Sequence, residues 1–209
     1  MDEMIYVVPT EKVMKLIDSF QTKDYIFAED SRNLLFDTIL AYRTLARRGD
    51  VEENPSFLQV IPYATIYTKE NGEYLFLAYK RSSKGNEKRL RNEKSIGFGG
   101  HMNDRDNCAI TCLERELKEE LSIDLMPHNL EFSGVIYTPY VDVSKVHVGL
   151  HYMYYIHPEK DVSISEEIES IELLNYKELL EIRSNLELWS KTIAYQMPNI
   201  LDSSVLTTI

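Results

Sequence analysis

The sequence lacks the features that mark zinc-binding, membrane-spanning or secreted proteins. It has only two cysteines, Cys108 and Cys112, and no second Cys/His pair at a suitable spacing, so a zinc site is not expected. No apolar run approaches the length of a membrane span, and the N-terminal residues lack the basic region of a signal peptide. We therefore expect a cytoplasmic protein with reduced, packed thiols and no membrane partner.

The sequence also has fewer basic than acidic residues. The 23 Lys and Arg face 34 Asp and Glu, a net charge of −11, which argues against a nucleic acid polymer as partner. Seven of the basic residues nevertheless fall between residues 80 and 94: Lys80, Arg81, Lys84, Lys88, Arg89, Arg91 and Lys94. This basic segment is either a solvated loop or a cationic rim that attracts a polyphosphate. In the second case Arg81 and Arg89 are the candidate substrate-binding residues, because a guanidinium engages two phosphate oxygens at once.

Three carboxylates are spaced for one face of a helix. Glu116, Glu119 and Glu120 stand at i, i+3 and i+4, directly after Arg115. Like charges this close destabilise a helix unless a cation lies among them. Carboxylate oxygens suit hard divalent ions, so the pattern indicates a site for Mg²⁺ or Mn²⁺. Taken alone, however, a Glu-rich helix is more often a solvated face.

The Gly99-Gly100 pair upstream changes this balance. With it, residues 99–123 resemble the signature of the Nudix hydrolase superfamily, G-x5-E-x7-R-E-U-x-E-E-x-G-U, where U is aliphatic. The residues that fill its slots are Gly100, Arg115, Glu116, Leu117, Glu119, Glu120 and Ile123. Residues 54–64, 84–103 and 145–152 also resemble a bacterial Nudix subgroup of predicted phosphoesterases.

The match to the signature departs in three places. One extra residue separates Gly100 from Arg115, and the first signature Glu is replaced by Asp106 or Asn107. Ser122 stands where the signature has Gly, so a left-handed helix stop there would be mildly strained. These departures concern the loop and the substrate rather than the three helical carboxylates.

The resemblance implies roles for these residues. Glu116, Glu119 and Glu120 would share metal binding and catalysis with the main-chain carbonyl of Gly99, and Arg115 would orient the carboxylates. The general base stays open among Glu116, Glu166 and Glu167. For His147 and His151, on one strand face, a packed or pocket-lining role is expected rather than metal ligation. Tyr137 and Tyr140 could stack a base, with core or surface packing as the default, and Trp189 is expected in the core.

Periodicity predicts an α+β fold. Helices are expected over 10–20, 31–48 (capped by Asp30 or Ser31), the signature helix, 176–182 and 186–196. Strands are expected over 57–69 and 74–81, joined by a hairpin at Asn71-Gly72, and over 131–137, 146–156 and 168–174. The buried stripe of the signature helix would be Ala109, Leu113, Leu117 and Leu121. The resemblance implies an α/β/α sandwich around a mixed sheet, with an N-terminal helical extension. The acidic turn over residues 50–55 predicts the boundary, with 1–53 as an N-terminal α/β extension packed on the catalytic domain and 54–209 as the Nudix domain.

The leading functional hypothesis is divalent-metal-dependent hydrolysis of a phosphoanhydride in a nucleoside diphosphate linked to another moiety. The alternative is a non-catalytic Nudix-type domain that binds a nucleotide as a sensor. An isopentenyl diphosphate isomerase-like enzyme is disfavoured, because no matching cysteine/glutamate pattern is present. The expected partner is a small nucleotide-type molecule, and a homodimer is left open.

Overall fold

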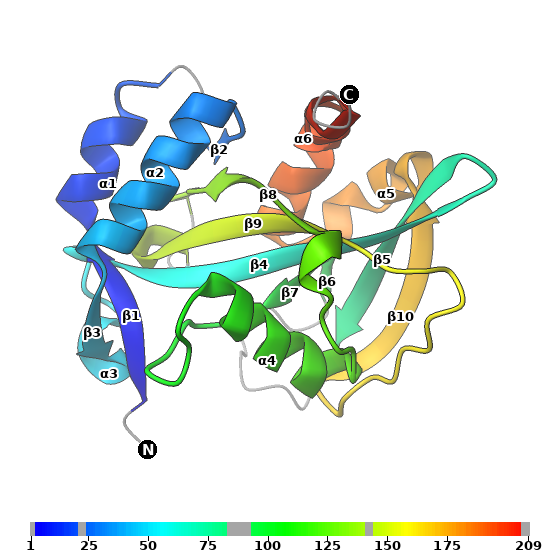
Figure 1. The fold of residues 1–209 in the computed structure, drawn as a ribbon, viewed down its shortest axis with the longest axis horizontal. Coiled ribbons are helices and arrows are strands. Elements are labelled where there is room, and N and C mark those ends of the chain that lie inside the picture. The colour runs from blue at the N-terminus through cyan, green and yellow to red at the C-terminus, as the bar shows by residue number, and fades with distance from the viewer. Residues whose placement is uncertain (1–2, 21–23, 83–92, 141–143, 206–209) are drawn as a thin grey trace. The chain divides into compact units, whose positions relative to one another are not determined.

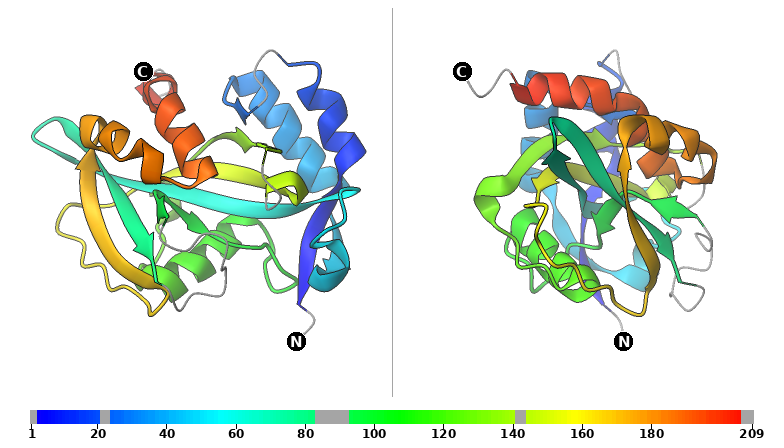
Figure 2. Two further views of the ribbon diagram at one scale, coloured as in Figure 1. Left: turned by 180° about the vertical axis from the view of Figure 1, so that it is seen from behind. Right: turned by 90° about the vertical axis from the view of Figure 1, so that its right-hand side faces the viewer.

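The computed structural model describes residues 3–20, 24–82, 93–140 and 144–205 (Figures 1 and 2). The chain forms two compact units, each assembled from three separate segments. The first unit contains Met1–Tyr63, Gly99–Cys112 and Phe132–His151, and the second contains Ala64–Phe98, Leu113–Glu131 and Tyr152–Ile209. Strands β4 (Phe57–Glu70) and β9 (His147–Tyr155) and helix α4 (Ala109–Leu121) contribute residues to both units. The domain boundary near residue 54 stays a prediction.

The first unit is built around N-terminal strands. Strand β1 (Met4–Pro9) pairs antiparallel with β3 (Thr44–Arg47) and with β4. Strand β2 (Tyr25–Ile26) pairs antiparallel with β8 (Leu130–Ile136). Helices α1 (Thr10–Ile17) and α2 (Glu29–Tyr42) lie side by side (Figures 1 and 2), and the short α3 (Arg48–Val51) follows β3. The N-terminal region therefore contains strands as well as the predicted helices.

The helix predicted over residues 31–48 is wrong at both ends. It begins at Glu29 after Ala28, which makes no side-chain cap, so the predicted cap at Asp30 or Ser31 does not form. It ends at Tyr42, because Arg43 has extended dihedral angles and the next four residues become β3. The cause is long-range: β1 offers backbone hydrogen bonds to Thr44–Arg47, and this pairing overrides local helix propensity.

The second unit contains the predicted hairpin. Strands β10 (Ile168–Asn175), β5 (Glu73–Arg81) and β4 are consecutive antiparallel neighbours, and β6 (Lys94–Ser95) pairs with β5. The turn between β4 and β5 has φ of 50° at Asn71 and 85° at Gly72, the positive values that a two-residue hairpin turn requires. The hairpin prediction is confirmed.

Two helices close the described chain. Helix α5 (Tyr176–Glu181) has a capping box, in which Asn175 Oδ1 accepts the Glu178 N–H at 3.0 Å and Glu178 Oε2 accepts the Asn175 N–H at 2.9 Å. Helix α6 (Leu188–Val205) runs past the predicted end, through Pro198. Strand β7 (Gly97–Gly99) and short 3₁₀ turns also belong to the described residues; the turns are Pro127–Asn129, Ser144–Val146 and Arg183–Asn185. The α+β prediction with a mixed sheet is confirmed.

Candidate active site

Helix α4 carries the three candidate carboxylates. Its predicted apolar stripe is confirmed, since Ala109 is 3% exposed and Leu113, Leu117 and Leu121 are fully buried. Burial of this stripe fixes the rotation of the helix, because residues at i, i+4 and i+8 share one face. The acidic positions 116, 119 and 120 are thereby turned away from the stripe.

The helix ends as the sequence predicts, at Ser122. Its φ is 56°, in the left-handed region. The Ser122 N–H donates to the Lys118 carbonyl at 3.2 Å, which is the bond of an αL helix end, and the Ile123 N–H donates to the Leu117 carbonyl at 3.2 Å. Ile123, buried after the turn, anchors the stop in spite of the strained serine.

Arg115 contacts the carboxylates beside it. Its Nη1 donates to Glu116 Oε1 at 2.5 Å and lies 4.0 Å from Glu119 Oε2. The Glu116 side chain is 16% exposed, whereas that of Glu119 is 64% exposed. Arg115 is therefore placed to orient Glu116. Its distance to Glu119 is at the limit of an ion pair.

Of the three carboxylates, that of Glu120 has the least compensation for its negative charge. Its Oε2 atom is buried and has no hydrogen-bond partner among the described residues. Burial raises the pKa of Glu120 to about 8; the carboxylates of Glu116, Glu167 and Glu119 act in the same direction, and only Arg81 opposes them. A buried carboxylate among like charges is unfavourable unless it takes up a proton or a cation.

The ligand types at this site fit a hard divalent cation, but the side chains must move to bind one. Three carboxylates from adjacent turns of one helix, one of them with an unsatisfied buried oxygen, are the ligand chemistry of Mg²⁺ and Mn²⁺. Across the described ranges, however, no three His, Cys, Asp or Glu side chains converge on one ligating point as they stand. Binding at this site therefore requires side-chain rotation, for which the exposed Glu119 is free enough.

Gly99, the fourth ligand implied by the resemblance, belongs to the first unit. Its φ is 149°, and a Cβ atom built there would lie 2.1 Å from the Pro62 carbonyl oxygen. Only glycine tolerates both the dihedral angle and this close approach.

The acidic loop before β10 runs along the end of α4. The Ser165 N–H donates to the Glu120 carbonyl at 2.9 Å, and the Ser82 N–H donates to the Glu167 carbonyl at 2.8 Å. These bonds bring Glu167, an exposed residue, into electrostatic range of the Glu120 carboxylate. Of the loop candidates Glu166 and Glu167, it is Glu167 whose charge acts on Glu120.

The basic segment is described only in part. Lys84, Lys88, Arg89 and Arg91 lie outside the described residues. Lys80 Nζ pairs with Glu169 Oε1 at 2.8 Å, and Lys94 Nζ pairs with the Glu172 carboxylate, so β10 engages both lysines. Arg81, at the end of β5, instead lies over the Tyr79 ring, with 5.4 Å between Cζ and the ring centroid.

The altered signature loop is held by Asp106. This side chain is 3% exposed, and its Oδ2 accepts the Asn103 N–H at 2.8 Å. The Asp106 N–H returns a bond to the Asn103 carbonyl at 3.0 Å. Of the two residues considered for the first signature position, Asp106 therefore fixes the loop of the first unit.

Of the two histidines on this strand face, His151 packs in the core and His147 is half-buried. His151 is fully buried, its Nδ1 lies 2.7 Å from the Tyr25 hydroxyl, and burial lowers its pKa to about 3. His147 Nε2 lies 3.2 Å from His101 Nε2. Trp189 is 8% exposed, as expected of a core residue.

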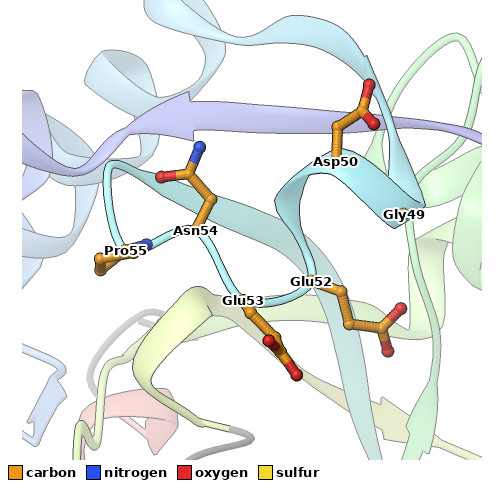
Figure 3. Close-up of a pocket in the computed structure, with 6 residues that line it drawn as sticks. All are labelled: Gly49, Asp50, Glu52, Glu53, Asn54 and Pro55. Carbon is orange, nitrogen blue, oxygen red and sulfur yellow. The ribbon is translucent and has the colours of Figure 1, made fainter.

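A second acidic cluster lies in the first unit, in a surface pocket between Gly49 and Pro55 (Figure 3). Asp50 points away from Glu52 and Glu53 in this view, and Glu52 is paired with Arg48 at 3.7 Å. The three carboxylates therefore do not form a common site.

Among the described residues, no helix combines the length and apolar content needed to cross a bilayer. One residue in contact with Arg81, Tyr79, was not predicted from the sequence. A tyrosine inside an alternating strand is indistinguishable from ordinary core, and only its contact with Arg81 sets it apart.

Comparisons with known proteins identify the family. No family model matches the chain. Protein YmaB of Bacillus subtilis (strain 168) is 35% identical over 205 residues, which cover 92% of this chain and 96% of YmaB. The crystal structure of Tm1382, a protein assigned to the Nudix hydrolases, superposes with a TM-score of 0.74 at 28% identity, covering 95% of this chain and all of Tm1382.

A C. elegans Ap4A hydrolase in a binary complex has the same fold, with a TM-score of 0.53 at 16% identity over 70% of this chain and 99% of that one. The resemblance carried by residues 99–123 is thus confirmed over nearly the whole length of the chain. The chain belongs to the Nudix hydrolase superfamily.

Proposed function

We propose that the protein hydrolyses a phosphoanhydride in a nucleoside diphosphate linked to another moiety, by attack of water at phosphorus, with Mg²⁺ or Mn²⁺ as cofactor. One observation carries this proposal: the buried, unpartnered Oε2 of Glu120 lies on the same helix as Glu116 and Glu119. A binding module would have no reason to keep a charge cluster that costs helix stability. The fold is shared with a hydrolase of Ap4A, a nucleotide, which supports the substrate class.

Each residue has a proposed task. Glu116, Glu119 and Glu120 would hold the cation, which when bound would supply positive charge for the phosphoryl oxygens and for the attacking water. The part of the Gly99 carbonyl stays a prediction. Arg115 orients Glu116 through their ion pair. Arg81 and Arg89 would contact the phosphoryl oxygens.

For the general base we choose Glu167. The Glu116 carboxylate is already engaged by the Arg115 guanidinium. Glu167 is exposed, and its charge reaches Glu120, so it can accept a proton from water beside the cation site.

The decisive experiment is a phosphate-release screen over nucleoside diphosphate derivatives, with Mg²⁺ and with Mn²⁺. We expect metal-dependent release from at least one derivative, and release that is lower by about a thousandfold from the Glu120→Gln variant. Tight nucleotide binding without release from any compound would instead identify the sensor domain.

The two arginines should respond differently to salt. Screening limits exposed charges to a reach of about 8 Å at physiological ionic strength but acts weakly on partly buried ones. If Arg89 belongs to the proposed cationic rim, Arg89→Ala should raise the Michaelis constant mainly at about 20 mM salt, and the effect should fade at about 300 mM. Arg81→Ala, at a half-buried position, should change the kinetics by a similar factor at both. If the Arg89→Ala ratio to wild type is the same at both salt concentrations, the cationic rim plays no part in binding.

A further inference from the structure

Tyr79 connects Arg81 to the interior of the second unit. Its side chain is 2% exposed and its ring packs on Phe98, with ring centroids 4.6 Å apart. Residues i and i+2 of a strand lie on the same face, so β5 places Tyr79 and Arg81 together. The guanidinium Cζ lies 5.4 Å from the ring centroid, within the range of a cation–π contact.

The other end of the Tyr79 side chain is anchored by buried hydroxyl groups. Its hydroxyl shares a hydrogen bond with the Ser95 side chain, and Ser95 is its cross-strand partner in the β5–β6 pair. Ser95 Oγ donates to Glu187 Oε1 at 3.1 Å. Ser190 Oγ donates to the same carboxylate oxygen at 3.0 Å and accepts the Ile96 N–H at 2.9 Å. Ser95 is 1% exposed and Ser190 is fully buried, so the chain of bonds is shielded from water.

The charges of Glu120 and Glu187 both act on the Tyr79 phenol. Burial raises the pKa of Tyr79; Glu120 and Glu187 act in the same direction, and Arg81 acts against them. The Arg81 guanidinium in turn lowers the pKa of Glu120. Tyr79, Arg81 and the Glu120 carboxylate therefore lie within electrostatic range of one another.

We propose that Tyr79 is a positioning residue, which fixes the orientation of the Arg81 guanidinium and is itself fixed by Ser95, Ser190 and Glu187. This inference rests on the proposed hydrolytic function. An arginine side chain has many rotamers, and a flat ring beneath its planar group restricts them at little cost. An ammonium group gains less from such a ring, because it cannot stack.

A double-mutant cycle between Tyr79 and Arg81 tests the proposal. Tyr79→Leu and Arg81→Ala should each lower kcat about tenfold, and the double variant should lose no more than either one. Mn²⁺ affinity, measured by calorimetry on the same proteins, should show the same non-additivity. Effects that multiply in the double variant would mean that Tyr79 acts only through the fold, and would overturn the proposal.

Two further variants serve as controls for the double-mutant cycle. Arg81→Lys keeps the charge without the planar group, so it should also lose about tenfold in kcat; full activity would overturn the proposal even if Tyr79→Leu fails to fold. Tyr67→Leu removes a comparable aromatic ring, one that packs on Tyr74 and Tyr155, and should leave kcat within about twofold. A wild-type protein that releases no phosphate would refute the proposed function itself, whereas an active wild type with a multiplicative cycle would refute only the role of Tyr79.

Discussion

Replacement of Glu120 by glutamine should lower turnover about a thousandfold and, in the same protein, stabilise the metal-free fold at pH 8. Turnover should fall because the carboxylate acts through a cation that offsets charge in the transition state. This interaction contributes several kcal/mol to transition-state stabilisation. The Michaelis constant should change little, since the charge is needed mainly in the transition state. The stability of the metal-free fold should rise because the variant no longer carries a buried charge among Glu116, Glu119 and Glu167.

The stability gain should depend on pH in a defined direction. The folded-state pKa of Glu120 is raised to about 8 from an ordinary value of 4.5, so the folded protein binds more protons than the unfolded chain between these values. Wild-type stability is therefore lost as pH rises through this window, whereas glutamine stays neutral. With a discount for partial exposure, we expect a difference on the order of 2 kcal/mol near pH 8 and little near pH 4.5.

Chemical denaturation in the presence of a chelator measures this difference. Glu119→Gln is the matched control: its side chain is 64% exposed, so it should lose turnover without gaining stability. A Glu120→Gln variant that retains turnover would favour the sensor hypothesis. One that is less stable than wild type at pH 8 would mean that the Glu120 charge is compensated in the fold.

Local patterns were sufficient to predict the elements that form the site. The stripe at Ala109, Leu113, Leu117 and Leu121 specifies the rotation of α4, and Asn71-Gly72 specifies the hairpin that ends at Arg81. Both signals are carried by residues close in the sequence, where periodicity and turn chemistry act directly.

What the sequence did not predict depends on distant partners. Residues 44–47 continue a helical pattern, yet they form β3 because β1 pairs with them. The chain of bonds from Glu187 to Tyr79 joins residues more than a hundred positions apart, and no spacing rule reports it. The raised pKa of Glu120 likewise arises from burial and from Glu167, which only the folded loop brings near.

A divalent cation should raise the melting temperature of the wild-type protein by about 5–10 °C. A ligand present at about a hundred times its dissociation constant stabilises the folded state by about 2.7 kcal/mol, provided that the unfolded chain lacks the site. In a protein of this length, each kcal/mol corresponds to about 2–4 °C. Mg²⁺ and Mn²⁺ at millimolar concentrations should both produce the shift in a thermal scan near neutral pH.

The shift in melting temperature should disappear when a carboxylate of the site is removed. It should persist when a carboxylate outside the site is removed. Glu116→Gln and Glu120→Gln each delete a charge proposed to hold the cation, so their melting temperatures should no longer respond to it. Glu114→Gln is the matched control, because Glu114 lies on the same helix at an exposed position outside the cluster and its loss should leave the response intact. If the wild type and Glu120→Gln are equally unmoved by both ions, the metal site does not exist, since the three carboxylates would then be a solvated face of α4.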